Sequence, residues 1–322
     1  MNQTTVKSEM DDVYRLAHEE AVLVDRSALS MLKFSGETRL DLINRMSTQN
    51  VIDLKKYEGA ATVLTTDIGR IIDRLILYVA KDTVYCFTGE NNGEAVAQYL
   101  MRFVFFMDDF QVEDLSSQTA VYGLYGRRSA EKAQELFGPL PELPLHHWRQ
   151  LELGSSTVYL HRTDPVAGDG FFISCERVDA PSLLDHLLAS GLQLIGDAEH
   201  DYLRIEAALP RFGRELTADY IPLESGLWSD VSFNKGCYTG QEIIARMESR
   251  GRLAKSLVRL KLPEMVDEGA ELTSQGKKAG SITSIANGPA GVLALGYVKT
   301  SMQETGNGLF TGQIPVEFVS NN

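Results

Sequence analysis

Residues Lys235–Glu242, which read KGCYTGQE, are the most informative stretch of this chain. Two glycines flank Cys237, and glycine permits the left-handed and strained backbone conformations of tight turns. Thr239 followed by Glu242 matches the Thr-x-x-Glu pattern of a capping box, which marks the start of a helix. Apolar residues then recur at helical spacing until Gly251, a typical helix stop. The segment therefore predicts a tight turn with Cys237 just before a helix N-terminus.

The position of Cys237 predicts a reactive thiol. Free N–H groups and the helix dipole favour a thiolate at a helix N-terminus. Lys235 lies two residues earlier, so an extended backbone would put its ammonium on the same side. The alternative is a buried structural cysteine beside a solvated lysine, because free cysteine often acts as a small hydrophobe. The combined pattern favours function, so Cys237 and Lys235 are candidate catalytic residues, whereas Cys86 and Cys175 lie in predicted strands and are assigned to the core.

Composition narrows the class of protein. The chain has 322 residues, 43% of them hydrophobic, which is enough for two or three packed domains. Its net charge of -13 argues against binding to the negatively charged backbone of a nucleic acid, so no direct nucleic-acid partner is expected. An odd number of cysteines without a CxxC pair predicts a reducing compartment and no metal site. A polar N-terminus and the lack of long apolar runs predict a cytoplasmic protein without a membrane segment.

The order of predicted elements indicates an α+β fold. Strands, a hairpin turn at residues 67–70 and helices near 38–48 and 92–104 make up a first unit, assigned to residues 1–118. A similar alternation of strands and helices makes up a second unit, assigned to residues 119–250. Short strands separated by glycine-rich turns follow in residues 251–322, and they predict a small β-barrel or sandwich.

The KGCYTGQE segment resembles the signature of the YgfZ family, whose members are related to the T-protein of the glycine cleavage system. The resemblance continues through residues 203–210, 221–224, 245–246 and 250–251. It implies a T-protein-like fold, in which two related α+β subdomains surround a folate funnel and a small β-barrel follows at the C-terminus. It also implies that the cofactor is tetrahydrofolate or another folate derivative.

The resemblance supplies candidate cofactor-binding residues. Glu206 stands where the T-protein family has a pterin-binding glutamate, and a carboxylate suits the paired N–H donors of a pterin. The residues alone favour a Glu206 that faces water on a short helix, since glutamate is mostly exposed. The resemblance adds Asp73, Gln241 and Glu242 to the cofactor-binding candidates.

One departure from the T-protein pattern bears on activity. The segment from Gly69 to Leu77 resembles the T-protein segment with two adjacent acids, one of which serves in aminomethyl transfer. Here the pair is Asp73 and Arg74, so a base replaces the second acid. Successive strand residues face opposite sides, so Asp73 is not expected to take the place of the missing acid. A charged hairpin edge is the alternative reading of both residues.

Three functions follow from these patterns. The first is a tetrahydrofolate-binding accessory protein for the assembly or repair of iron–sulfur clusters in client enzymes, which would affect tRNA modification only indirectly. The second is a folate-dependent aminomethyltransferase, and this would make the protein an enzyme. The third is an interaction scaffold in which Cys237 is structural. The lost acid at position 74 favours the first function over the second.

Overall fold

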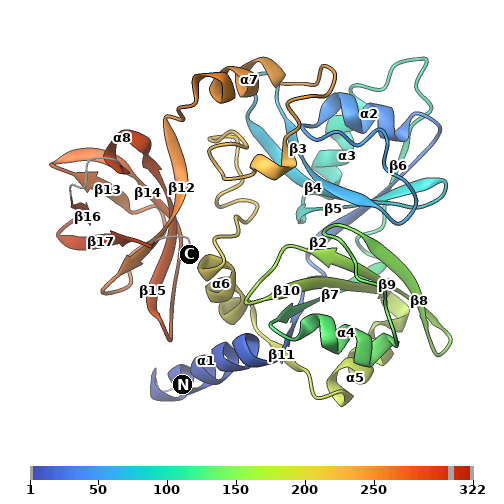
Figure 1. The fold of residues 1–322 in the computed structure, drawn as a ribbon, viewed down its shortest axis with the longest axis horizontal. Coiled ribbons are helices and arrows are strands. Elements are labelled where there is room, and N and C mark those ends of the chain that lie inside the picture. The colour runs from blue at the N-terminus through green and yellow to red at the C-terminus, as the bar shows by residue number, and fades with distance from the viewer. Residues whose placement is uncertain (1–2, 304–307, 320–322) are drawn as a thin grey trace.

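The computed structural model describes residues 3–303 and 308–319, which form two β-sheets with helices and a separate barrel (Figure 1). The first sheet has the strand order β3-β4-β5-β2-β6 and is antiparallel throughout. Its strands are β2 (Leu29–Ser35), β3 (Gly59–Thr65), β4 (Ile71–Val79), β5 (Thr83–Glu90) and β6 (Gln111–Asp114). Helices α2 (Arg39–Met46) and α3 (Gly93–Met101) pack on this sheet through buried apolar residues.

The second sheet has the order β11-β1-β7-β10-β9-β8. Its strands are β1 (Val22–Asp25), β7 (Thr119–Gly126), β8 (Trp148–Leu153), β9 (Ser156–Thr163), β10 (Asp169–Glu176) and β11 (Gln193–Ile195). Only the β1–β11 pair is parallel among the described pairs of this sheet. Helices α4 (Ser129–Phe137) and α5 (Ala180–Ala189) cover one face, and a 3-10 turn (Arg177–Asp179) precedes α5. The strand β1 thus joins the second sheet, although it falls within the residues that the sequence assigned to the first unit.

The C-terminal strands form a closed barrel in the order β12-β15-β14-β13-β16-β17. They are β12 (Lys255–Leu262), β13 (Glu271–Ser274), β14 (Lys277–Gly288), β15 (Gly291–Lys299), β16 (Leu309–Thr311) and β17 (Ile314–Phe318), with the single-turn helix α8 (Thr300–Gln303) after β15. The predicted α+β fold with two subdomains and a C-terminal barrel is therefore confirmed.

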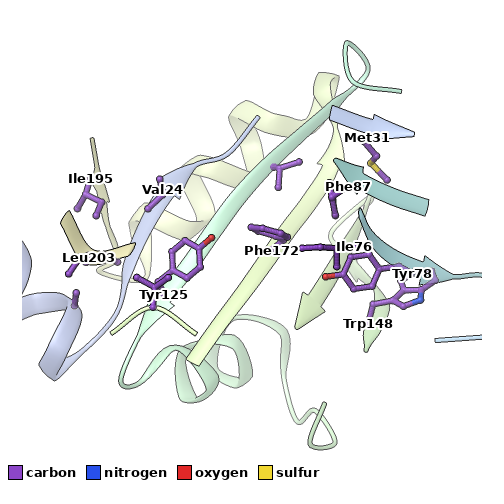
Figure 2. Packing of buried hydrophobic residues seen from close by; sticks show 14 of the residues in the cluster. Val24, Met31, Ile76, Tyr78, Phe87, Tyr125, Trp148, Phe172, Ile195 and Leu203 are labelled. Atoms are coloured by element: carbon purple, nitrogen blue, oxygen red, sulfur yellow. The ribbon is translucent and has the colours of Figure 1, made fainter. Parts of the chain in front are cut away.

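The two sheets share one core along the seam where they meet. Tyr78 and Phe87 of the first sheet belong to one apolar cluster with Trp148 and Phe172 of the second (Figure 2). Ring centroids across the seam are 4.3 Å apart for Tyr78–His161, 5.3 Å for Phe87–His161 and 5.4 Å for Phe87–Phe172. Full burial of such a side chain contributes about 1.5–3 kcal/mol. The seam therefore fixes the two subdomains against each other and sets the shape of any cavity between them.

Three further helices connect the units. The N-terminal helix α1 (Gln3–Glu19) contacts β7, β14 and α6 (Asp197–Glu206), which itself packs against the barrel. An irregular segment, with a 3-10 turn at Trp228–Asp230, leads to α7 (Gln241–Arg250). None of the described helices is long and apolar enough to cross a membrane.

Candidate functional site

A cavity of about 120 Å³ lies between the two sheets and the segment that follows α6. Its walls are mostly apolar and partly aromatic. The apolar lining comprises Leu29, Ile76, Phe87, Tyr125, Val166, Phe172, Leu209, Phe212 and Leu216. The polar lining includes Asp73, Arg74, Glu90, Asp164 and His200. We call this space the central cavity.

A second cavity, of about 360 Å³, continues from the central cavity toward the barrel. Arg74, Asp164, Leu209 and Pro210 line both cavities, so the two meet at these residues. The second cavity is more polar and includes Arg259 of β12 in its wall. A ligand with a flat ring and a polar tail could therefore span both spaces.

Arg74 is held between two aspartates where the cavities meet. Its Nη1 and Nη2 donate to the carboxylate of Asp164 at 2.6 and 3.1 Å, and its Nε donates to Asp230 at 2.6 Å. Burial alone would lower the pKa of Arg74 and raise the pKa of Asp164. The attraction between the opposite charges reverses both shifts, so the Arg74 pKa is raised and the Asp164 pKa is lowered. The guanidinium thus remains charged and compensates two buried carboxylates.

Asp73, which precedes Arg74 on β4, directs its carboxyl group to Gly89 near the end of β5. Its carboxyl oxygens accept hydrogen bonds from the Gly89 amide (2.8 Å), the Asn92 side chain (2.8 Å) and the Arg74 amide (2.7 Å). The side chain is fully buried, and burial raises its pKa to about 6 in spite of these hydrogen bonds. Both residues of the Asp73–Arg74 pair line the central cavity, although they contact different partners.

The raised pKa of Asp73 predicts a specific dependence of stability on pH. An acid whose pKa is raised from about 3.9 to about 6 on folding stabilises the protein most below pH 3.9, and this contribution is lost as pH rises through about 6. The loss amounts to about 3 kcal/mol, and Asp73→Asn removes it. In urea unfolding, the stability of Asp73→Asn relative to wild type should therefore rise by about 3 kcal/mol between about pH 4 and pH 7. The exposed Asp53→Asn serves as control, and a pH-independent difference for Asp73→Asn would contradict the expectation.

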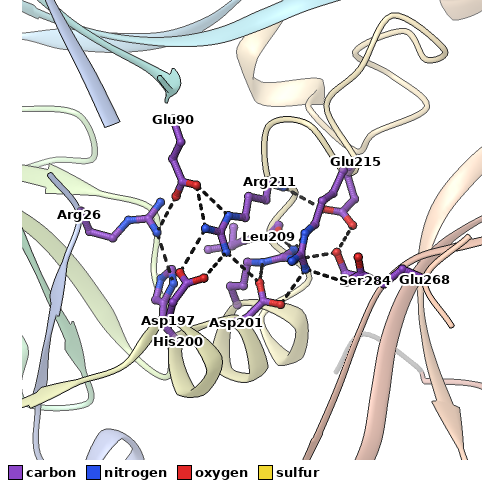
Figure 3. A network of polar contacts seen from close by, with 12 residues as sticks. Arg26, Glu90, Asp197, His200, Asp201, Leu209, Arg211, Glu215, Glu268 and Ser284 are labelled. Carbon is purple, nitrogen blue, oxygen red and sulfur yellow. Dashed lines mark hydrogen bonds and ion pairs between the residues drawn. The ribbon is translucent and has the colours of Figure 1, made fainter. Parts of the chain in front are cut away.

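A network of buried charges borders the central cavity (Figure 3). Arg211 pairs with Glu90 at 2.7 Å and with Asp201 at 3.3 Å, and Arg204 pairs with Asp201 at 2.6 Å. Arg204 also binds Glu215 at 3.1 Å and donates to Ser284 of the barrel at 2.7 Å. The network joins the first sheet, α6 and the barrel, and the sequence analysis did not find it. The dense alternation of charges in residues 201–215 was the available signal.

The ammonium group of Lys235 is bound by backbone carbonyl groups of the protein. Its Nζ donates hydrogen bonds to the carbonyl oxygens of Asn44, Ser47 and Gln49 at 2.6, 2.9 and 2.7 Å. These carbonyls lie at and just beyond the C-terminal end of α2, where a cation is favourable. Burial lowers the pKa of Lys235 to about 8. The ammonium therefore fixes the end of α2, while Cys237 two residues later is exposed to solvent.

The turn before α7 depends on glycine and not on a capping box. Gly240 is the N-cap residue with a φ of 84°, and no side chain caps the helix, so the capping-box prediction for Thr239 and Glu242 was wrong. A Cβ at Gly240 would lie 2.6 Å from the Thr66 carbonyl oxygen and 2.8 Å from the Gly69 Cα. Close packing against the β3–β4 turn thus requires glycine here. The predicted stop at Gly251 is confirmed, because this residue adopts a left-handed conformation at the end of α7.

The remaining predicted site residues lie apart from the central cavity. Among the described residues that line it, none comes from the KGCYTGQE segment, so Gln241 and Glu242 are not brought to Asp73. Glu206 does not line it either. Its carboxylate accepts a hydrogen bond from the Tyr14 hydroxyl at 2.7 Å and contacts His18 Nε2 at 2.8 Å, which attaches α1 to the end of α6. A pterin-binding role for Glu206 stays a prediction.

Comparisons with known proteins agree with this architecture. A chloroplastic protein of Arabidopsis thaliana, named only as a transferase, is 29% identical over 295 residues and is matched over 91% of this chain and 68% of its own length. The aminomethyltransferase of Halalkalibacterium halodurans is 27% identical, with 88% and 79% covered. The crystal structure of glycine cleavage system aminomethyltransferase T from Bartonella henselae shares the fold with a TM-score of 0.85, at 23% identity, over 97% of this chain and 88% of that one. The model of the GCVT N-terminal domain matches residues 3–235, and the chain therefore belongs to the GCVT family.

Proposed function

We propose that this protein binds a reduced folate in the central cavity and does not carry out aminomethyl transfer. The observation that carries the proposal is Arg74, which is clamped by Asp164 and Asp230 where the two cavities meet. The resemblance to the T-protein segment implies an acid at position 74 in members with aminomethyltransferase activity, where a carboxylate could accept a proton. A guanidinium remains protonated in proteins and cannot do this.

The lining residues fit a folate. A pterin is a flat heteroaromatic ring with several N–H donors, and the central cavity offers aromatic walls together with the carboxyl group of Asp73. We propose Asp73 as the acidic residue nearest the ring. The adjoining polar cavity, with Arg259 in its wall, suits the acidic tail of a folate.

We further propose that the folate-bound protein supports the assembly or repair of iron–sulfur clusters in client enzymes, with Cys237 as the exposed reactive group and Lys235, bound to the carbonyls near the end of α2, as the residue that positions it. This step rests on the resemblance of the KGCYTGQE segment to the YgfZ signature and on the exposure of Cys237. An effect on tRNA modification would then be indirect, through cluster-containing enzymes. The second candidate is a true aminomethyltransferase, and the names of relatives at 25–28% identity favour it.

Calorimetric titration with tetrahydrofolate tests the binding step. We expect binding by wild type and a loss of affinity of about two- to twelvefold in Phe87→Leu, because a lost aromatic contact costs about 0.5–1.5 kcal/mol. Phe34→Leu is the matched control, since Phe34 is a buried phenylalanine of the same sheet that does not line the cavity. Equal affinities in wild type and Phe87→Leu, or no binding by wild type, would show that tetrahydrofolate does not bind in the central cavity.

A complementation experiment tests the role of Cys237. In a bacterial strain that lacks its own YgfZ protein, wild type should restore the activity of iron–sulfur enzymes, and Cys237→Ser should restore less than about a tenth of it, because a hydroxyl is a far weaker nucleophile and soft-metal ligand than a thiolate. Cys86→Ser is the comparison for a buried thiol. Full restoration by Cys237→Ser would leave Cys237 without a function, and failure of wild type would argue against the iron–sulfur role.

A further inference from the structure

A separate cavity of about 220 Å³ opens at the other end of the seam between the two sheets. Tyr85 of β5 and Tyr159 of β9 both line it, with ring centroids 6.1 Å apart and ring planes tilted by 47°. Met31 and Leu115 add a thioether and an aliphatic wall. We call this space the distal cavity, because it shares no lining residue with the central cavity.

Alternation along the strands separates the two cavities. On β5, Tyr85 lines the distal cavity and Phe87 lines the central one, and on β10 Ser174 and Phe172 do the same. Side chains two residues apart on a strand point to the same face. The Phe87 and Phe172 rings, whose centroids are 5.4 Å apart, therefore form a partition between two chambers within one inter-sheet layer.

The distal cavity holds a buried polar group at its wall. Ser174 is fully buried, and its Oγ lies 3.0 Å from Nε2 of His161, which is also fully buried. Gln118 and Thr119 supply further polar groups at the lining. At the rim, the Arg177 guanidinium donates to the carbonyl oxygens of Ser117 and Thr119 at 2.9 and 2.6 Å.

The charges around the distal cavity favour a neutral or cationic ligand over an anion. Glu176 is the one charged residue among the described residues of its lining. The neighbouring base Lys33 is bound to Glu113 at 2.9 Å, and Arg177 is occupied by the carbonyls of the rim. An apolar cavity of about 150 Å³ is large enough to bind benzene, so the distal cavity has room for a substituted single ring.

We propose that the distal cavity is a second ligand site, distinct from the folate site, for a small flat aromatic molecule that is neutral or carries an amine. The ring packs against the wall that Tyr85 and Tyr159 form together, and an ammonium or N–H group is directed to Glu176 at the rim. The proposal does not depend on folate binding, because the two cavities have no residue in common.

Trp148 provides a direct readout. Its ring is buried, with its centroid 6.1 Å from that of Tyr85 and 5.9 Å from that of Tyr159, and its emission should respond to an occupant of the distal cavity. Trp228→Phe removes the other tryptophan, which is largely exposed. In this background, phenethylamine should change the emission saturably and bind about two- to fivefold more tightly than phenylacetate, the range expected for one exposed carboxylate.

Two variants and one competitor decide the outcome. Glu176→Gln should abolish the preference for phenethylamine over phenylacetate, and Leu115→Phe should weaken both at least tenfold by filling the cavity. Excess tetrahydrofolate should not displace phenethylamine. The proposal is overturned if the signal does not saturate, if wild type binds both probes with equal affinity, or if binding is unchanged in both variants. Displacement of phenethylamine by tetrahydrofolate would also overturn it, because the probe would then lie in the central cavity.

Discussion

Replacing Arg74 with methionine should destabilise the protein by about 3–5 kcal/mol, since removing one partner of a buried ion pair leaves an uncompensated charge. Arg74 is the common partner of Asp164 and Asp230, and all three side chains are largely buried. The loss is a large fraction of the 5–15 kcal/mol that typically separates folded from unfolded proteins. Urea unfolding at neutral pH, monitored by circular dichroism, measures it.

Two controls separate the charge from the loss of packing. Arg15→Met removes an exposed arginine that pairs with Asp12, and it should change stability by less than about 0.5 kcal/mol. Combining Arg74→Met with Asp164→Asn and Asp230→Asn should recover most of the lost stability, because no buried charge then remains unpaired. A triple variant as unstable as Arg74→Met alone would show that the charges are not the cause.

In an aminomethyl-transfer assay, the purified protein should turn over at least about 100-fold more slowly than a genuine T-protein, the low end of what a positioned acid or base contributes. The guanidinium of Arg74 stays protonated and would repel a cationic, iminium-like carbon beside the folate nitrogen. The measurement is folate methylenation with a loaded aminomethyl carrier protein. Loss of Arg74 is not itself expected to create the activity, since Asp164 and Asp230 would then be unpaired.

Turnover comparable to that of the T-protein control would contradict the proposed function and support the assignment as an aminomethyltransferase. Tetrahydrofolate affinity, measured on the same preparation, distinguishes the possible causes of inactivity. A protein that binds folate without turnover supports the proposed function, whereas a protein that neither binds nor reacts leaves the central cavity without its proposed ligand.

The sequence predicted the architecture because periodic signals are local. The hairpin between β3 and β4, the helix after the KGCYTGQE segment and the short barrel strands each follow from residues close together in the chain. The helix α1 and the edge strand β11 were missed, since α1 begins among polar residues and β11 has only three residues. Strand pairing between β1 and β7 joins residues about a hundred positions apart, and no local pattern reveals it.

The candidate site was less predictable for the same reason. Asp73 and Arg74 attracted attention in the sequence, but Asp164 and Asp230, which bind Arg74, have no local signature. The spacing of Lys235 from Cys237 predicted a shared face, but the three carbonyls near the end of α2 that its ammonium contacts have no local signature in the sequence. Which charges meet is decided by tertiary packing, and spacing along the chain cannot specify it.

The pairing of β1 with β7 and β11 has a consequence for synthesis. The first sheet, residues 29–114, is an insertion between β1 and the remainder of the second sheet, so the two domains are nested and not consecutive. On a ribosome the inserted domain is complete first and can fold co-translationally. The strand β1, which emerges before it, must wait unpaired until β7 and then β11 have been made. Completion of the second sheet must therefore wait until β11, which ends at Ile195, has been made, and a break after residue 118 would separate β1 from both of its neighbours.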